Sequence, residues 1–235
     1  MEQRIEKLGS IQLAALVHDL RTPMCVAAGA AQMALDAGGK DVSAQLRQIL
    51  LAVNAMDRML SMHGEERHEA GIFTAAELQR ELLAMTQERA LRKKQRLSID
   101  LSALEGVILQ ADNAALNRVL INLLGNAMKY TQEGGSVTLR AQTEHRSREK
   151  EQMSVRFIIT DDGPGMSRAF MRQMYLPFAR AKETAQEPGE GLGLSIVRDM
   201  VKRLGGTIRV HSARGRGTVF AVIVPVRIVG GGMVN

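Results

Sequence analysis

Residues 153–165 read MSVRFIITDDGPG, an apolar run that ends in two aspartates and a glycine-rich turn. The β-branched and aromatic residues in its first part predict a buried strand over 153–160. A carboxylate at a strand end, such as that of Asp161, can accept a hydrogen bond from an exocyclic amine. Gly163 and Gly165 would let the backbone approach a flat ring. The same pattern is also typical of an ordinary turn.

Strand-like and helix-like segments alternate on both sides of this stretch. The predicted strands cover residues 96–101, 106–110, 136–141, 153–160, 207–211 and 218–226, and the predicted helices cover 113–130, 167–175 and 192–204. A further helix, ending near residue 95, is predicted to begin at the capping-box pattern Thr74-Ala75-Ala76-Glu77. These segments predict an α+β fold in which a mixed sheet carries helices on one face, as an α/β sandwich.

The first sixty residues have a different pattern. Leucines and other apolar residues recur at three- and four-residue spacing before and after the break at residues 37–41. This predicts an antiparallel helical hairpin whose apolar stripes are covered in a homodimer, as a four-helix bundle. The predicted domains are 1–66 for the hairpin and 67–228 for the sandwich, with a flexible tail at 229–235. Residues 144–152 are expected to form a charged hairpin tip, and Cys25 is expected to be buried.

Composition restricts the function. The net charge is +6, but basic and acidic residues are interleaved and aromatics make up only 3%, which disfavours nucleic-acid binding. No apolar run is long enough to cross a bilayer, and the start lacks the apolar core of a secretory signal. No membrane contact is therefore expected within this chain.

A second glycine cluster, Gly189-Glu190-Gly191-Leu192-Gly193, precedes a predicted amphipathic helix. Backbone N–H groups in such a loop can bind phosphate oxygens, and the helix N-terminus adds partial positive charge. The cluster lacks the Gly-Lys-Ser/Thr of a P-loop and the preceding strand of a dinucleotide fingerprint. A flexible loop that caps a helix is the alternative.

Polar residues also interrupt the predicted helix over 113–130. Asn122 and Asn126 lie one turn apart with Lys129 close by, so amide oxygens could bind Mg²⁺ while the ammonium binds a phosphate. Asparagines within a helix can equally face solvent.

The first predicted helix contains His18-Asp19-Leu20-Arg21-Thr22-Pro23. Most of a histidine is neutral at pH 7, so His18 offers the lone pair needed to attack phosphorus. Asp19 could accept the other ring N–H, although a His-Asp pair on a solvated helix face has the same appearance. Pro23 removes a backbone N–H and is expected to bend the helix after His18.

In this order and spacing, the motifs resemble the catalytic core of two-component sensor histidine kinases. Residues 18–23 resemble the H box, 122–130 the N box, 161–165 and 189–193 the two glycine boxes, and 176–180 the F box. Residues 215–218 resemble the last glycine turn. The resemblance implies an N-terminal dimerisation and histidine-phosphotransfer hairpin and a GHKL domain with the Bergerat-type ATP-binding fold.

The resemblance also implies residue roles. Asp161 would bind the adenine amine, Asn126 would ligate Mg²⁺ beside Asn122, and residues from about 166 to 188 would form the ATP lid. The remaining contacts to ATP would come from Lys129, Tyr130, Gly163, Gly165, Arg180, Gly189, Gly191, Leu192, Gly193 and Thr218. His18 would be the nucleophile, assisted by Asp19, and Thr22 would position water for a phosphatase reaction.

The implied activity is ATP-dependent autophosphorylation of His18 and transfer to an aspartate of a response-regulator receiver domain. The implied location is the cytoplasm, either as a soluble kinase or as the cytoplasmic part of a membrane-bound sensor. One alternative is a phosphatase-biased or non-catalytic module, favoured by the carboxylate of Glu190 beside the expected phosphates. A gyrase-type or chaperone-type ATPase is another, but it would need a catalytic glutamate where this chain has Asn122.

Overall fold

The computed structural model divides the chain into two compact units, Met1–Arg67 and His68–Asn235. It describes residues 2–37, 42, 44–46, 48–49, 52–53, 56, 70–147, 151–176, 179 and 193–230. For residues 2–16, 18–19 and 145–147 this description covers the backbone alone. The two units are treated one at a time.

The first unit begins with the long helix α1, Glu2–Asp36. The helix continues through Pro23 and ends in a turn at Ala37, where the predicted break begins. Helical backbone returns at residues 44–46, 48–49, 52–53 and 56, within the predicted second helix. The rest of that helix lies outside the described residues, so the hairpin is supported only in part.

One prediction for this unit is wrong: Cys25 is exposed. Pro23 and Ala30 are buried and lie seven residues apart, on one face of α1. Cys25 follows Pro23 by two residues, which rotates it by about 200° to the opposite face. Apolar neighbours in the sequence therefore misled the prediction, because burial on a helix depends on its face.

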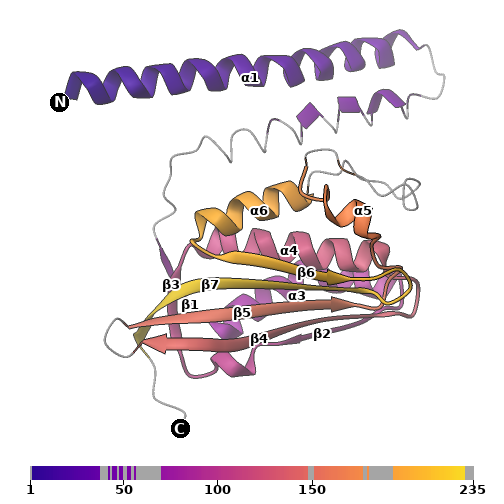
Figure 1. Cartoon of the computed structure of the whole chain (residues 1–235). Helices are drawn as coiled ribbons and strands as arrows, with labels where there is room; N and C mark the ends of the chain where they lie inside the picture. The colour runs from indigo at the N-terminus through magenta and orange to yellow at the C-terminus, as the bar shows by residue number, and fades with distance from the viewer. Residues whose placement is uncertain are drawn as a thin grey trace. The chain divides into compact units, whose positions relative to one another are not determined.

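The second unit is built on one seven-stranded mixed sheet (Figure 1). Its strands are β1 (Gly71–Thr74), β2 (Arg96–Asp100), β3 (Ile108–Ala111), β4 (Ser136–Ser147), β5 (Gln152–Asp161), β6 (Thr207–Ser212) and β7 (Thr218–Gly230). The order is β1-β3-β7-β5-β4-β2, and β6 also pairs with β7. Only the β2–β4 pair is parallel among the pairs of these described strands.

Three helices cover one face of this sheet (Figure 1): α3 (Ala75–Arg92), α4 (Asn113–Tyr130) and α6 (Gly193–Arg203). Helix α4 contacts both α3 and α6. Alternate residues of β5 are buried, namely Met153, Val155, Phe157 and Ile159, as expected for a strand with one face against a core. The predicted α+β fold is confirmed for this unit.

The start of α3 follows from its capping box. The Thr74 side chain accepts a hydrogen bond from the Glu77 backbone N–H, and Glu77 Oε2 accepts one from the Thr74 backbone N–H at 2.8 Å. Two unpaired donors of the first turn are thereby satisfied. The predicted capping box is confirmed.

Several predicted boundaries need correction. The four-residue strand β1 and a short 3-10 helix, Ser102–Leu104, were not predicted. Strands β4 and β5 extend into the predicted charged tip, where Ser147 pairs with Gln152. Backbone hydrogen bonds between β4 and β5 stabilise this two-stranded extension, so the polar side chains of the segment do not end the strands. Beyond α5 (Arg168–Met171), the predicted helix over 167–175 continues only as turns.

Candidate functional site

Asp161 ends β5 and pairs in the sheet with Thr218, the first residue of β7. Its Oδ1 atom accepts a hydrogen bond from the Gly163 backbone N–H at 3.0 Å. Burial raises the pKa of the Asp161 carboxyl to about 6, although backbone N–H groups of Gly163 and Thr218 oppose that rise and Asp162 adds to it. A half-buried carboxyl group that exchanges protons near neutral pH is typical of a functional site.

The glycine turn after Asp161 is fixed by its neighbours. Gly165 has φ +66°, and a side chain there would collide with the backbone oxygen of Ala213. On the other side, the Gly215 N–H donates to Pro164 O at 2.8 Å. The Met166 N–H donates to Ser212 Oγ at 2.8 Å. These contacts lock the loop of Asp161 to the turn between β6 and β7.

Helix α4 presents the two predicted asparagines as half-buried side chains. Its other face is buried in the core through Leu123, Leu124, Ala127 and Met128. Asn122 Nδ2 donates to Arg118 O at 2.7 Å, so its other amide atom, Oδ1, is directed away from its own helix. An amide oxygen in this position can serve as a ligand or an acceptor.

Helix α6 begins beside these asparagines. A Cβ atom at Gly193, its first residue, would lie 3.5 Å from Asn122 Oδ1 and 3.6 Å from Asn126 Nδ2. The N-terminus of a helix carries partial positive charge and unpaired N–H groups, which favour an anion. The structure therefore brings the end of the second glycine cluster and the asparagine pair to one place.

The last turn of α4 carries Lys129 and Tyr130. Lys129 Nζ donates to Tyr130 OH at 3.1 Å and lies 4.6 Å from the centre of the Tyr130 ring. The ring face favours a nearby cation. An ammonium group and an aromatic surface are thus held together about one turn beyond Asn126.

These residues fit ATP with Mg²⁺. Two amide side chains and a helix N-terminus suit a metal–phosphate group, Lys129 adds positive charge, and Asp161 offers an acceptor for an amine. The adjacent backbone of Thr131 approaches Gly163, since a Cβ at Gly163 would lie 3.4 Å from Thr131 N. Asn126 would hold the Mg²⁺ with Asn122 beside it, and the metal would neutralise phosphate charge.

Other predicted site residues are placed less completely. His18 and Asp19 lie in α1, but their side chains are outside the described residues, whereas Thr22 is exposed on the same helix. Thr218 is buried, and its hydroxyl lies 3.0 Å from Ser212 Oγ. The predicted ligands Arg180, Gly189, Gly191 and Leu192 also lie outside the described residues.

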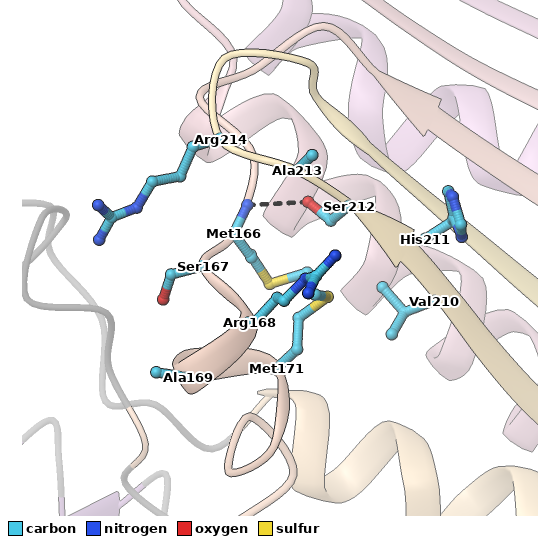
Figure 2. Close-up of a pocket in the computed structure, with 10 residues that line it drawn as sticks. All are labelled: Met166, Ser167, Arg168, Ala169, Met171, Val210, His211, Ser212, Ala213 and Arg214. Carbon is cyan, nitrogen blue, oxygen red and sulfur yellow. Dashed lines mark hydrogen bonds between the residues drawn. The ribbon is translucent and has the colours of Figure 1, made fainter.

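A groove of about 650 Å³ lies beside the contact between Met166 and Ser212, and Figure 2 shows the residues that line it. Arg168, His211 and Arg214 line it together with methionine side chains. None of the residues that line the groove is one of the predicted nucleotide ligands. The groove is therefore distinct from the place where Gly193 approaches Asn122 and Asn126.

Sequence reasoning missed three residues that support the site. Ser212 joins two glycine turns, because its Oγ accepts from the Met166 N–H and donates to Gly217 O at 2.9 Å. Lys93 and Gln95 donate to carbonyl oxygens at the end of α4. These contacts join residues far apart in the sequence, so no local pattern reveals them.

The fold and site have known counterparts. A family model described as "Histidine kinase-, DNA gyrase B-, and HSP90-like ATPase" matches residues 111–228, half of the chain. The virulence sensor protein BvgS of Bordetella bronchiseptica is 33% identical over 228 residues, which cover 89% of this chain. The chain spans only 18% of the length of BvgS.

Two solved histidine kinases share the fold. Full-length ShkA in complex with AMPPNP has a TM-score of 0.58 and 27% identity, over 94% of this chain and 46% of ShkA. ThkA in complex with the response regulator TrrA has a TM-score of 0.56 and 24% identity, over 95% of this chain and 63% of that one. The chain belongs to the family of histidine kinase-, DNA gyrase B- and HSP90-like ATPases, and it is a relative of the catalytic cores of sensor histidine kinases.

Proposed function

We propose that this chain is an ATP-dependent protein-histidine kinase that phosphorylates His18 and passes the phosphoryl group to an aspartate of a response-regulator receiver domain. The observation that carries the proposal is the position of the α6 N-terminus at Gly193, against Asn122 and Asn126 of α4. In a family of ATPases, this arrangement supports binding of the phosphates and their metal ion at that place.

The predicted site residues would divide nucleotide binding between them. Asp161 would accept a hydrogen bond from the adenine amine, and Tyr130 would lie against the nucleotide. Lys129 would contact the phosphates, together with Arg180 and the backbone of residues 189–193. Gly163 and Gly165 let the loop of Asp161 pack closely against Thr131 and Ala213, and Thr218 supports Asp161 through its backbone N–H. Positioning and charge neutralisation are the main requirements of phosphoryl transfer.

His18 would act as the nucleophile. Its imidazole lone pair would form the bond to the terminal phosphorus of ATP as the bond to the bridging oxygen breaks, and ADP would leave. The phosphorylated ring would be an imidazolium whose charge Asp19 stabilises, and it would then release its remaining N–H proton to solvent. In the second step, the carboxylate of a receiver aspartate would form a bond to the phosphorus as the bond from phosphorus to His18 breaks.

Relatives support the partners. ThkA is known in a complex with a response regulator, which suggests a receiver domain as the acceptor here. Exposed apolar side chains on α1 suggest that two copies pair through the first unit as a homodimer. Both units would lie in the cytoplasm. None of the described helices is long and apolar enough to cross a membrane.

The test is labelling with ATP. The protein should acquire a phosphate that is labile to acid and stable to alkali, and His18→Gln should abolish the label. His211→Gln is the matched control, because His211 is an exposed histidine on β6 of the other unit. Labelling that persists in His18→Gln would remove His18 as the acceptor.

A second candidate is a module in which phosphatase activity dominates. Thr22 favours it, because this hydroxyl is exposed and lies four residues, about one helical turn, after His18. If this candidate is correct, Thr22→Ala should slow dephosphorylation of a phosphorylated receiver domain and leave the labelling of His18 unchanged. Equal dephosphorylation by both proteins would exclude a role for Thr22.

A further inference from the structure

Lys93, the residue after α3, is joined to the end of α4. Its Nζ atom donates to three backbone oxygens: Met128 O at 3.1 Å, Lys129 O at 2.7 Å and Thr131 O at 3.1 Å. Lys93 is half-buried, and its own backbone closes α3 by donating to Arg89 O. One ammonium group therefore links the ends of two helices.

Gln95 strengthens the same connection. Its Nε2 atom donates to Thr131 O at 2.8 Å, to Met128 O at 3.0 Å and to Gln132 O at 3.2 Å. Gln95 and Thr131 are both buried, with exposed fractions of 8% and 1%. The contacts of Gln95 to Met128 and Thr131 are thus shielded from competing water, and those of Lys93 are shielded in part.

These contacts satisfy a general need of helix ends. The last carbonyl groups of a helix have no partner within it, and they carry partial negative charge. An ammonium group supplies three donors and a full positive charge, so its hydrogen bonds to carbonyl oxygens are stronger than neutral ones. Lys93 therefore stabilises the final turn of α4 in its helical form.

That final turn belongs to the proposed nucleotide site. It carries Lys129 and Tyr130, whose ammonium and hydroxyl groups are 3.1 Å apart. Its backbone also lies against the glycine turn, because a Cβ at Gly163 would lie 3.4 Å from both Thr131 N and Tyr130 C. Gly163 in turn donates to Asp161.

We infer that Lys93 is a positioning residue for nucleotide binding, because it holds the α4 turn that carries Lys129 and Tyr130 and packs against Gly163. The inference depends on the proposed function, in that the same site binds ATP. Lys93 itself acts through backbone oxygens and is assigned no contact with the nucleotide.

Lys94 provides a matched control in the next position. Its Nζ atom pairs with Glu133 Oε1 at 2.7 Å, and 78% of its side chain is exposed. Exposed ion pairs contribute little to stability. Lys93→Met and Lys94→Met remove the same charge from the same loop, so any difference between them reflects the contacts to α4.

The first measurement is the affinity for ADP in the presence of Mg²⁺, by calorimetric titration of the full chain. Lys93→Met should weaken binding about tenfold, which corresponds to ~1.4 kcal/mol. Lys94→Met should change the affinity by less than about twofold, as expected for an exposed charge. Equal affinity of wild type and Lys93→Met would overturn the inference.

The second measurement separates positioning from general stability. The chain has only two tyrosines, so ¹³C-labelled tyrosine gives two ring signals, which Tyr175→Phe assigns. Without nucleotide, Lys93→Met should shift or broaden the Tyr130 signal and leave the Tyr175 signal in place. Unchanged Tyr130 signals, or equal changes at both rings, would contradict a local role of Lys93.

Lys93→Arg keeps the test decisive if Lys93→Met does not fold. The guanidinium group retains the charge, but its planar fork does not match three converging oxygens. The Arg variant should therefore lose part of the ADP affinity and shift the Tyr130 signal, while wild-type affinity and an unchanged signal would contradict the inference. Failure of wild type to bind ADP would instead disprove the proposed function.

Discussion

The carboxyl group of Asp161 lies in an environment that disfavours its charged form. Its carboxyl pKa is raised from 3.8 to about 6, chiefly because the group is buried. Above pH 6 the folded protein holds a charged carboxylate away from water, which costs stability. As the pH falls through 6, the folded state takes up a proton before the unfolded chain does, so this cost disappears by about pH 4.

We therefore predict that Asp161→Asn raises the free energy of unfolding by about 1 kcal/mol at pH 7.5 and by much less at pH 4.5. The figure is modest because the amide accepts the N–H groups of Gly163 and Thr218 less strongly than a carboxylate does. The same variant should lose ADP binding, because the amide alters the acceptor for the adenine amine. Denaturant unfolding and calorimetric titration measure the two effects.

Asp162→Asn is the control for this prediction. Asp162 Oδ1 accepts from the Ser136 N–H at 2.9 Å on the exposed side of the turn. The Asp162 charge is the smallest cause of the raised Asp161 pKa, so any gain in stability should be smaller than for Asp161→Asn, and no loss of ADP binding is expected. If Asp161→Asn destabilised the protein at pH 7.5, the argued cost of burying the carboxylate would be wrong.

At the scale of elements, the junction between α4 and α6 determines the site. A Cβ at Gly193 would make ordinary contacts with Asn122 and Asn126, at 3.5–3.6 Å, so a methyl group fits but a larger side chain does not. A salt bridge of 3.4 Å between Arg203, at the end of α6, and Asp112, at the start of α4, joins the two helices at the ends away from Gly193. Together these contacts set how closely α6 approaches the asparagines.

Gly193→Val should therefore weaken Mg²⁺–ADP binding by at least about tenfold, since its branched carbons would occupy the space beside both carboxamides. Gly193→Ala should fold normally and retain most of the affinity. Calorimetric titration of the two variants compares them directly. Unimpaired binding by Gly193→Val would show that the phosphates bind elsewhere.

The elements differ in how far the sequence could predict them. The bounds of α4 were predicted correctly, because Asp112 caps its start and an apolar stripe runs through it. Strand β1 escaped prediction, since four residues with Ile72 exposed carry too little alternation. The cap formed by Lys93 depends on oxygens 35 to 38 residues away, which only the folded chain brings into reach.

The same distinction applies to the site. Asp161, Asn122 and Asn126 could be named as candidate ligands because their motifs are local and their order matches a family. Their approach to Gly193 is a property of the α4–α6 packing, which the sequence pattern does not contain. Cys25 shows the converse, because its neighbours in the sequence suggested burial and its helix face determines exposure.

For the whole molecule, the exposed side chains of α1 bear on assembly. Val17, Met24 and Leu35 are 51%, 57% and 78% exposed, and their spacing of seven and eleven residues places them on one helix face. A long apolar stripe of this kind is typical of a helix that packs against a partner.

The chain should therefore be a dimer, and the double variant Met24→Glu, Leu35→Glu should be a monomer because it introduces two charges into the apolar face. Val26→Glu with Met33→Glu makes the same change in net charge at exposed positions on the opposite face of α1 and should remain dimeric. Sedimentation equilibrium measures the mass. A dimeric double Glu variant would show that this face of α1 is not the dimer interface.

The central claim is that the nucleotide bound between α4 and α6 phosphorylates the histidine of α1. It is tested most directly by incubating the protein with ATP and Mg²⁺ and mapping the phosphate by mass spectrometry at alkaline pH. The account predicts phosphate on His18 of the wild type and none on Asn126→Ala, although that variant still folds. Phosphate on another residue, or on His18 at the same rate in Asn126→Ala, would contradict it.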